Sequence, residues 1–140
     1  MLFRSLSLTG LTRALRVLVT APPGTPERRV ADAMRANPAW TSGSTRPDRA
    51  LVDAVPGLLL KAGAEGVHGM GLADGRGVAF KIDDGDGARR ARIPVAIALL
   101  RELGADDLPG TDRAVLDDLA AAPVYGGGRV VGEIRATLPF

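Results

Sequence analysis

The chain has 140 residues, of which 46% are hydrophobic and only 4% aromatic, and its formal net charge is +2. This composition predicts a globular domain whose core is built mainly from Ala, Leu and Val, and it excludes fibrous and disordered classes. Charges of both signs are interspersed without a basic block, which argues against nucleic-acid binding. The absence of cysteine excludes disulfides, thiolate chemistry and any Cys-based zinc site in this chain.

The N-terminal segment begins as a moderately apolar stretch, but Arg13 and Arg16 interrupt it before it reaches membrane-spanning length. No small-residue cleavage site follows a continuous apolar run, so a secretory signal is not indicated. We therefore expect a soluble, cytoplasmic protein that does not enter a membrane.

Two amphipathic helices are predicted near the N-terminus. Apolar residues recur at three- and four-residue spacing from Leu8 to Val19, and the Ala-Pro-Pro-Gly sequence that follows ends the first helix. Thr25 followed by Pro26 is a typical helix start and predicts a second helix to about residue 36.

Residues 39–48 are small and polar apart from Trp40. This composition predicts an ordered loop, anchored by the Trp40 side chain. A short helix over residues 48–54 is expected to follow it.

An antiparallel sheet is predicted in the middle of the chain. The β-prone runs 67–72 and 77–82 flank an Asp-Gly pair, which is a strong hairpin signal. The run Leu58–Leu60, which leads into Lys61, is expected to form a third strand or extended segment beside them. The Asp-rich sequence 83–87 predicts a turn.

The last part of the chain is expected to contain two helices and a strand. Apolar spacing from Ile93 to Leu100 predicts one helix, and a second is expected over 112–120. Alternation over 129–136 predicts the strand. Residues 1–140 are therefore expected to form a single domain of mixed α/β (α+β) class, an antiparallel sheet with helices packed on it.

Lys61 is the sharpest local feature, because it ends an apolar run in a chain that has two lysines and sixteen arginines. A lysine in such a chain indicates that the ε-amine itself is needed. An amine shielded from water beside Gly63 and Gly66 can act as a general base or activate a hydroxyl nucleophile. The alternative is a structural lysine that extends into solvent from the strand end or pairs with Glu65.

Other polar positions have structural interpretations. His68 is the only histidine and is expected to be structural. The 83–87 sequence lacks the regular ligands of a calcium loop. Arg89, Arg90 and Arg92 are expected to form a solvated helix start.

Two further motifs are weak as functional signals. Ser42 and Ser44 lie in a small-residue loop, but neither has a base nearby in the sequence, so each is a minor nucleophile candidate. Gly126–Gly128 follows no predicted strand and precedes no predicted helix, so a phosphate-binding loop is not indicated.

Four blocks of the sequence together resemble a known family. In chain order they read PPGTPERRVADAMRANP, WTSGSTRPD, PGLLLKAGAEGV and GVAFKIDDG. They are similar to the C-terminal part of the asparaginase II-type enzymes, the thermolabile or rhizobial kind, which are related to serine β-lactamases and glutaminases. The resemblance extends over essentially the whole chain.

The resemblance implies an amidohydrolase that converts L-asparagine, or a similar small amide, to L-aspartate and ammonia through a serine acyl-enzyme. It assigns Lys61 as the catalytic residue of this portion. It also implies a set of substrate-binding or site-forming residues, which are Gly43, Arg46, Asp48, Gly63, Glu65, Lys81 and Asp84.

In full-length members of that family, the nucleophilic serine and the residues that hold zinc lie upstream of the portion seen here. The resemblance therefore implies no cofactor or metal ligand in this chain, and either a homodimer or a missing N-terminal half as its partner. Two other hypotheses remain. One is a non-catalytic truncated paralogue or split-enzyme subunit that binds a partner, and the other is a self-sufficient hydrolase that uses Ser42 or Ser44.

Overall fold

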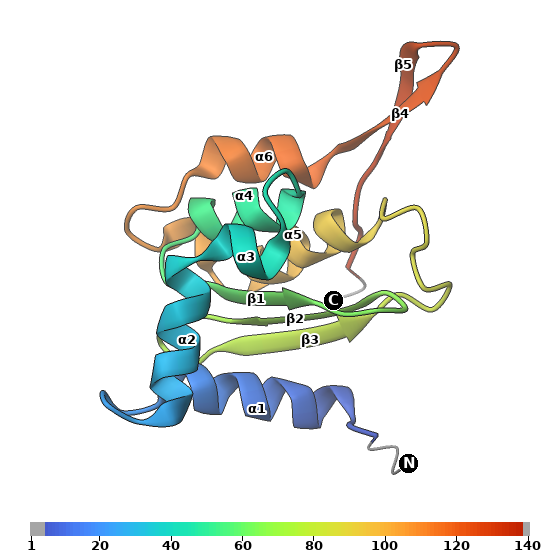
Figure 1. Cartoon of the computed structure of the whole chain (residues 1–140). Helices are drawn as coiled ribbons and strands as arrows, with labels where there is room; N and C mark the ends of the chain where they lie inside the picture. Colours follow the sequence, from blue (N-terminus) through green and yellow to red (C-terminus); the bar gives the residue numbers. More distant parts are fainter. Residues whose placement is uncertain (1–4, 139–140) are drawn as a thin grey trace.

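A three-stranded antiparallel sheet lies between helices in the computed structural model, which describes residues 5–138 (Figure 1). Helix α1 covers one face of this sheet, and α4, α5 and α6 cover the other. The strands are β1 (Leu59–Ala62), β2 (Val67–Gly71) and β3 (Gly77–Lys81), in the order β1-β2-β3. The helices are α1 (Leu8–Thr20), α2 (Pro26–Ala36), α3 (Pro38–Ser42), α4 (Pro47–Ala54), α5 (Arg92–Glu102) and α6 (Arg113–Ala120), with a 3-10 turn η1 (Ala105–Asp107). The mixed α/β (α+β) class predicted from the sequence is confirmed.

The first two helices begin at residues whose side chains cap them. The Ser7 hydroxyl accepts a hydrogen bond from the Gly10 amide at 3.0 Å, and the Thr25 hydroxyl accepts one from the Arg28 amide at 3.3 Å. These side chains satisfy amide groups that the first turn of a helix leaves without a partner. Local sequence therefore determines where α1 and α2 start.

The register of the sheet assigns its residues to two faces. Lys61 pairs with Gly69 and Ala62 with His68, so the members of each pair lie on the same face. Leu59 and Lys61 therefore lie on the face covered by α1, whereas Ala62 and His68 lie on the opposite face.

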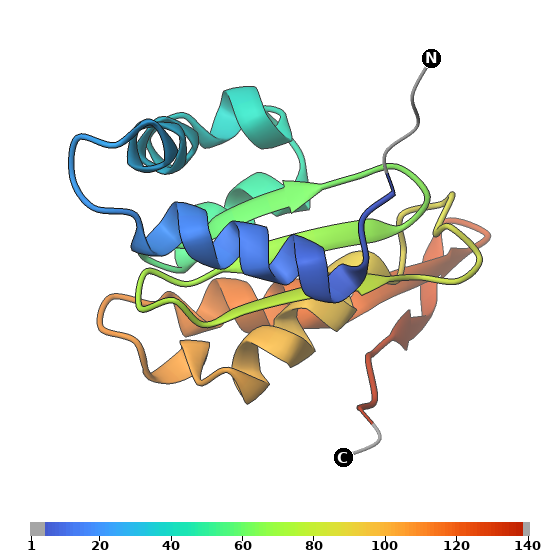
Figure 2. The same ribbon diagram turned by 90° about the horizontal axis from the view of Figure 1, so that it is seen from below.

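Helix α1 lies across the sheet, which Figure 2 shows from the side of the helix. Glycines in β2 allow the helix to pack closely there. A Cβ atom at Gly69 would lie 2.7 Å from a methyl group of Leu15, and one at Gly71 would lie 3.0 Å from a methyl group of Val19. Leu15, Val19 and Leu59, with Ala31 from α2, form a small core on this side.

The larger core lies on the other face of the sheet. It joins β1 and β2 to the apolar faces of α4, α5 and α6, so most of the buried apolar area lies in this layer. Its fully buried large side chains include Leu51, Leu60, Met70, Ile97, Leu100 and Leu116.

The predicted loop over 39–48 is partly wrong. Pro38 starts the short helix α3, in which the Gly43 amide donates to the Ala39 carbonyl at 2.9 Å. This turn directs Trp40 outward, where 90% of the residue is exposed. Trp40 is therefore not the anchor of the segment, because the helical turn places Ser42 inward instead.

The predicted C-terminal strand exists, but it does not join the main sheet. It is β5 (Arg129–Ile134), and it pairs with a strand that was not predicted, β4 (Ala122–Gly126). Gly126 ends β4 and Gly127 and Gly128 form the turn of this hairpin, so the statement that these glycines follow no strand is wrong. Since the strand β5, and not a helix, follows them directly, they do not form a phosphate-binding loop.

The β4–β5 hairpin projects from the rest of the molecule (Figure 1). Tyr125, Val130 and Val131 are all more than 60% exposed on it. No helix within residues 5–138 is both long enough and apolar enough to span a membrane.

The tight turn between β1 and β2 generates a test of the fold. Gly66 has a φ of 71°, and a Cβ atom there would lie 2.9 Å from the carbonyl oxygen of Ile82. We expect Gly66→Ala to lower the free energy of unfolding by about 2–4 kcal/mol, because neither backbone can move away. Urea unfolding measures this loss.

The matched control is Gly24→Ala, since Gly24 has a φ of 86° but no other atom lies within 4 Å of the point that its Cβ atom would occupy. Only the positive φ is then penalised, which costs about 1 kcal/mol. Equal losses in the two variants would show that the contact with Ile82 is not a constraint.

Candidate functional site

The predicted site residues gather at one end of the main sheet, where β1 ends, β2 begins and β3 ends. The β1–β2 turn and the loop that follows β3 lie together at this end (Figure 1). Their proximity is direct, because Gly66 closely approaches both Ile82 and Gly85. Helix α3 reaches the same end through a hydrogen bond from Lys61 to Thr41, and Arg46, ahead of α4, lines a cavity there together with Ala62 of β1.

Lys61 is exposed near the end of β1, and its Nζ donates to the Thr41 carbonyl of α3 at 3.1 Å. This hydrogen bond connects the strand to the short helix. The described residues do not shield the amine from water, contrary to the hypothesis of a desolvated lysine. Within residues 5–138 no carboxylate lies within 4.0 Å of this amine, so the suggested ion pair with Glu65 is also absent.

Lys81, Glu65 and Asp84 shape the two turns beside β1. The Lys81 Nζ donates to the Glu65 carbonyl at 2.7 Å and to the Ile82 carbonyl at 3.2 Å. Glu65 itself has a positive φ of 53°, an uncommon conformation for a residue with a side chain. The Asp84 carboxylate accepts the Asp86 amide at 2.8 Å. These contacts stabilise the two turns.

A buried ion pair anchors the loop that leads into α5. The Nε of Arg92 lies 3.0 Å from the Asp86 carboxylate, and both residues are less than 10% exposed. The Arg92 guanidinium also donates to the Gly63 carbonyl at 3.4 Å, which joins this loop to the end of β1. The prediction that Arg92 belongs to a solvated helix start is therefore wrong, because its ion pair with Asp86 holds the side chain in a buried position.

The Asp86 carboxylate has several further donors. Its oxygens accept the backbone amides of Arg90 at 2.8 Å, Ala91 at 3.1 Å and Arg92 at 3.1 Å. Burial by itself raises the pKa of Asp86, but the hydrogen bonds from these amides and from the Arg92 side chain hold it below its usual range. Asp86 therefore contributes more stability as a charged group than as a neutral one.

Asp48 and His68 form a second buried pair, on the core side of the sheet. The Asp48 Oδ1 and His68 Nε2 atoms lie 3.1 Å apart, although their alignment does not meet hydrogen-bond geometry. The His68 ring is completely buried and packs edge-on against Phe80, with ring centroids 5.3 Å apart. Its burial agrees with the structural role expected from the sequence.

The charge of Asp48 is favoured by its surroundings. Burial raises the pKa of the carboxyl, but the contact with His68 and the nearby charge of Arg92 outweigh it and hold the pKa below its usual range. Asp48 thus remains an anion at neutral pH.

Gly43 and Arg46 form one unit ahead of α4. Gly43 has a φ of 91°, and a Cβ atom there would lie 3.3 Å from the Cδ of Arg46. The Arg46 side chain therefore lies over the bare backbone of Gly43. Arg46 and Asp48 then line a small cavity of about 70 Å³ together with Pro47, Ala62, Arg89, Arg92 and Ile93.

The sequence-predicted residues thus separate into two groups around the end of β1. Lys61 contacts α3 on the face of α1, whereas Asp48 and the cavity lie on the opposite face. Gly63 joins the two regions, because its amide donates to the Val67 carbonyl at 2.8 Å and its carbonyl accepts from Arg92. Sequence analysis missed the contributions of Asp86 and Arg92 to this region, since their pairing depends on the folded loop.

Neither serine candidate has a base beside it. The Ser42 Oγ is buried and has no hydrogen-bond partner among residues 5–138. Ser44 is exposed, and its carbonyl accepts from Arg49 at 3.2 Å. The described part of the chain also contains no group of three or more His, Asp or Glu side chains placed to hold a metal ion.

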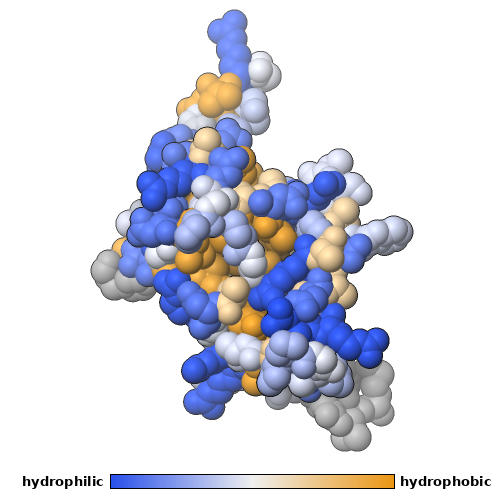
Figure 3. All heavy atoms as spheres, turned by 90° about the vertical axis from the view of Figure 1, so that its left-hand side faces the viewer, coloured by the Kyte–Doolittle hydropathy of each residue, from blue (hydrophilic) through white to orange (hydrophobic). Residues whose placement is uncertain are grey.

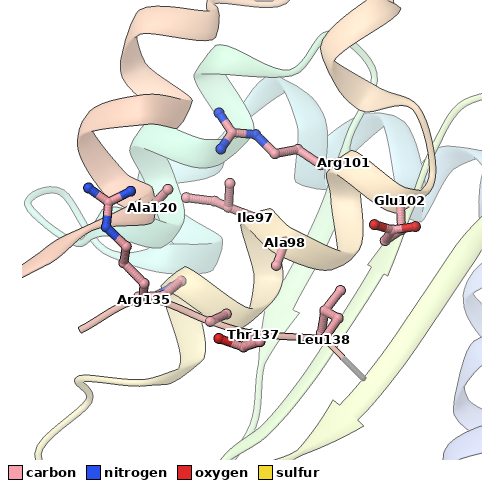
Figure 4. Close-up of a pocket in the computed structure, with 10 residues that line it drawn as sticks. Ile97, Ala98, Arg101, Glu102, Ala120, Arg135, Thr137 and Leu138 are labelled. Carbon is pink, nitrogen blue, oxygen red and sulfur yellow. The ribbon is translucent and has the colours of Figure 1, made fainter. Parts of the chain in front are cut away.

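A separate cleft of about 390 Å³ lies between α5 and the C-terminal segment (Figure 4). Arg101 and Arg135 line it, but Arg101 already pairs with Asp106 at 3.1 Å and Arg135 pairs with Glu133. None of the sequence-predicted site residues borders this cleft, so it does not belong to the candidate site.

The residues of the candidate site all lie in the part of the chain that matches a known protein family. The family model for L-asparaginase II matches residues 3–136. The chain belongs to the L-asparaginase II family. A comparison with curated proteins finds no match.

The L-asparaginase II assignment confirms the resemblance inferred from the four sequence blocks. All eight predicted site residues lie within the matched span, from Gly43 to Asp84. The family is therefore established for the region that contains Lys61, while the role of each side chain remains a prediction.

The Asp86 site predicts a pH-dependent stability. We expect Asp86→Asn to lower the free energy of unfolding at pH 7 by about 2–4 kcal/mol, because it leaves Arg92 buried beside a neutral partner. The folded-state pKa of Asp86 is lowered, so its stabilisation is complete above the unfolded pKa of about 3.9 and is lost as pH falls through the folded value. Urea unfolding between pH 2 and pH 7, roughly the range of this titration, measures the difference.

Asp83→Asn is the control, because Asp83 is exposed in the same turn. Its effect is expected to be within about 0.5 kcal/mol at every pH. A constant difference between wild type and Asp86→Asn across the acid range would contradict the assigned charge of Asp86.

Proposed function

We propose that this chain is part of an L-asparaginase, which hydrolyses the side-chain amide of L-asparagine to L-aspartate and ammonia. The observation that carries the proposal is Lys61. It stands in a K-x-G-A-E-G block inside the family-matched span, and its exposed amine has the Thr41 carbonyl as a hydrogen-bond acceptor. An ammonium has three N–H donors, so further donors are available to a ligand.

The proposed reaction proceeds in two steps. A serine hydroxyl attacks the amide carbonyl, the C–N bond breaks, and the nitrogen leaves as ammonia after taking up a proton. Water then hydrolyses the acyl ester, which releases aspartate and restores the serine. Lys61 acts as the electrostatic or proton-handling partner, because a fixed positive charge stabilises the negative charge that develops on the carbonyl oxygen.

The nucleophile in this proposal comes from an N-terminal half. By resemblance it is the serine of a Ser-x-x-Lys motif, and that motif occurs nowhere in the 140 residues. A self-sufficient hydrolase is the weaker hypothesis, because the Ser42 hydroxyl is buried and neither Ser42 nor Ser44 has a base beside it. Zinc, where full-length relatives hold it, would be bound by residues of that other half.

We expect the 140-residue chain by itself to release no ammonia from L-asparagine, because it lacks an activated nucleophile. A coupled ammonia assay on the purified chain measures this, with Lys61→Ala as the blank. Turnover clearly above that blank would contradict the need for a second half.

The second candidate is a non-catalytic subunit or truncated paralogue that binds a partner. Exposed apolar side chains support it, since Trp40 and the hairpin residues Tyr125, Val130 and Val131 are largely open to solvent. Figure 3 also shows a hydrophobic area in the middle of one face of the molecule, enclosed by hydrophilic atoms. Such surfaces are typical of a chain that packs against another one.

Co-expression with the adjacent open reading frame separates the two candidates. In a split enzyme we expect a stable complex that releases ammonia, and Lys61→Ala is expected to reduce kcat by about 10²–10³ while leaving the complex intact. A complex that forms without any ammonia release favours the non-catalytic subunit. Val131→Asp, on the exposed hairpin, is the matched variant that is expected to weaken the complex without unfolding the chain.

A further inference from the structure

A groove of about 520 Å³ lies between the base of the β4–β5 hairpin and the helices α5 and α6. Its walls are largely apolar, and the side chains that form them include Ile93, Pro94, Leu119, Pro123, Tyr125 and Val130. We propose that this groove is the docking site for an apolar segment with acidic residues, which belongs to the nucleophile-bearing half of the enzyme.

The hairpin side of the groove is an apolar surface that is open to solvent. The register of the two strands shifts between Val124 and Tyr125, which places Tyr125 opposite Val130, and both side chains line the groove. Both residues are largely exposed, on a ribbon that projects from the helices (Figure 1). An isolated two-stranded hairpin is only marginally stable in water, so a partner that covers this face would stabilise it.

Three prolines make the groove a rigid receptor. Pro47 is the first residue of α4, Pro94 lies in the first turn of α5 and Pro123 lies in β4, and all three line the groove. The proline ring fixes φ, so these walls have little backbone freedom to lose when a ligand binds. Ile93, which also lines the groove, belongs to the larger core and holds the α5 wall in place.

The charges at the groove select the chemistry of the segment. Arg89 and Arg90 line it and are exposed, and within residues 5–138 no carboxylate lies within 4.0 Å of either guanidinium. Among the described residues, Asp118 is the only acidic side chain in the lining. The groove therefore has an excess of positive charge, and an apolar segment with Asp or Glu residues is complementary to it.

A second copy of this chain fits the groove less well. The exposed apolar element that it has to offer is its own hairpin, and Arg129 lies beside Val130 at the start of β5. Insertion of that hairpin would bring a third arginine toward Arg89 and Arg90, and like charges at an interface repel. The net charge of +2 on each chain acts in the same direction. The occupant is therefore a different polypeptide.

The groove also reaches the end of the sheet at which the predicted site residues gather. Pro47 and Arg89 line both the groove and the small cavity beside Ala62, at the end of β1. A segment bound in the groove would hold the rest of its polypeptide at this end. The inference rests on the proposed function, which requires a second half that brings the serine to this region.

The test is the dissociation constant of the co-expressed complex between this chain and the product of the adjacent open reading frame, measured by analytical ultracentrifugation of diluted samples. We expect Tyr125→Ala to raise the Kd about thirtyfold, as for an aromatic residue that dominates an interface. Arg90→Glu is expected to raise it about tenfold. The effect of Arg90→Glu should disappear in about 1 M NaCl, because salt screens exposed charges.

Arg29→Glu is the matched control, because it makes the same charge change at an exposed position of α2, on the other side of the molecule from the hairpin (Figures 1 and 2). Its Kd is expected to stay within about twofold of the wild-type value. Tyr125→Phe keeps the ring and should retain the affinity, and thermal unfolding of each variant checks that the fold is retained. An unchanged Kd in Tyr125→Ala, equal losses in Arg90→Glu and Arg29→Glu, or the absence of a complex would overturn the proposal.

Cross-linking tests the identity of the occupant. A photoreactive benzoylphenylalanine in place of Tyr125 is expected to attach, on irradiation of the complex, to a segment of the other half in which Asp or Glu lies among apolar residues. Mass spectrometry identifies that segment. Attachment to a second copy of this chain, or to a segment without acidic residues, would reject the assigned occupant.

Failure of this inference is distinguishable from failure of the proposed function. A complex that releases ammonia, and whose Kd is unchanged in Tyr125→Ala, would sink the docking groove and leave the asparaginase activity standing. A complex that depends on Tyr125 and Arg90 but releases no ammonia would keep the groove and reject the activity.

Discussion

The ion pair between Asp86 and Arg92 holds together the end of the sheet on which the candidate site depends. The Asp86 carboxylate accepts hydrogen bonds from three backbone amides and from the Arg92 guanidinium. Arg92 in turn donates a hydrogen bond to the carbonyl of Gly63. Burying two charges is favourable only when their hydrogen bonds are satisfied, and here the backbone of the loop supplies them. The conformation of the loop and the position of the β1–β2 turn are therefore coupled through one pair of side chains.

Helices and strands with local signals were predictable from the sequence. The helix start at Thr25 and the Asp-Gly turn between β2 and β3 depend only on residues a few positions away in the chain. Two other features depend on distant partners. Arg92 is buried because Asp86 lies six residues before it in a folded loop, and β4 exists because β5 pairs with it. Charge clustering and short apolar runs do not contain that information.

In the candidate site, too, some features were predictable from the sequence and others depend on the fold. The family resemblance selected Gly43, Arg46 and Asp48 as a loop, but only the structure shows why these three occur together: the glycine accommodates the arginine, and the arginine shares a cavity with the aspartate. Lys61 was selected for its amine, yet the contact that positions it is a backbone carbonyl of α3, which no side-chain pattern reveals. Sequence reasoning identified residue types that chemistry needs, whereas packing determined which of them meet.

The glycine-lined contact between α1 and β2 has a consequence for how a second polypeptide would be joined. Because Gly69 and Gly71 let Leu15 and Val19 sit against the strand, the helix cannot slide along the sheet without collisions. Its first turn is thereby held at the end of the sheet that carries Lys61 (Figure 2). A tether attached ahead of Ser7 would start close to the site, so a short linker would give an attached nucleophile-bearing half a high effective concentration there.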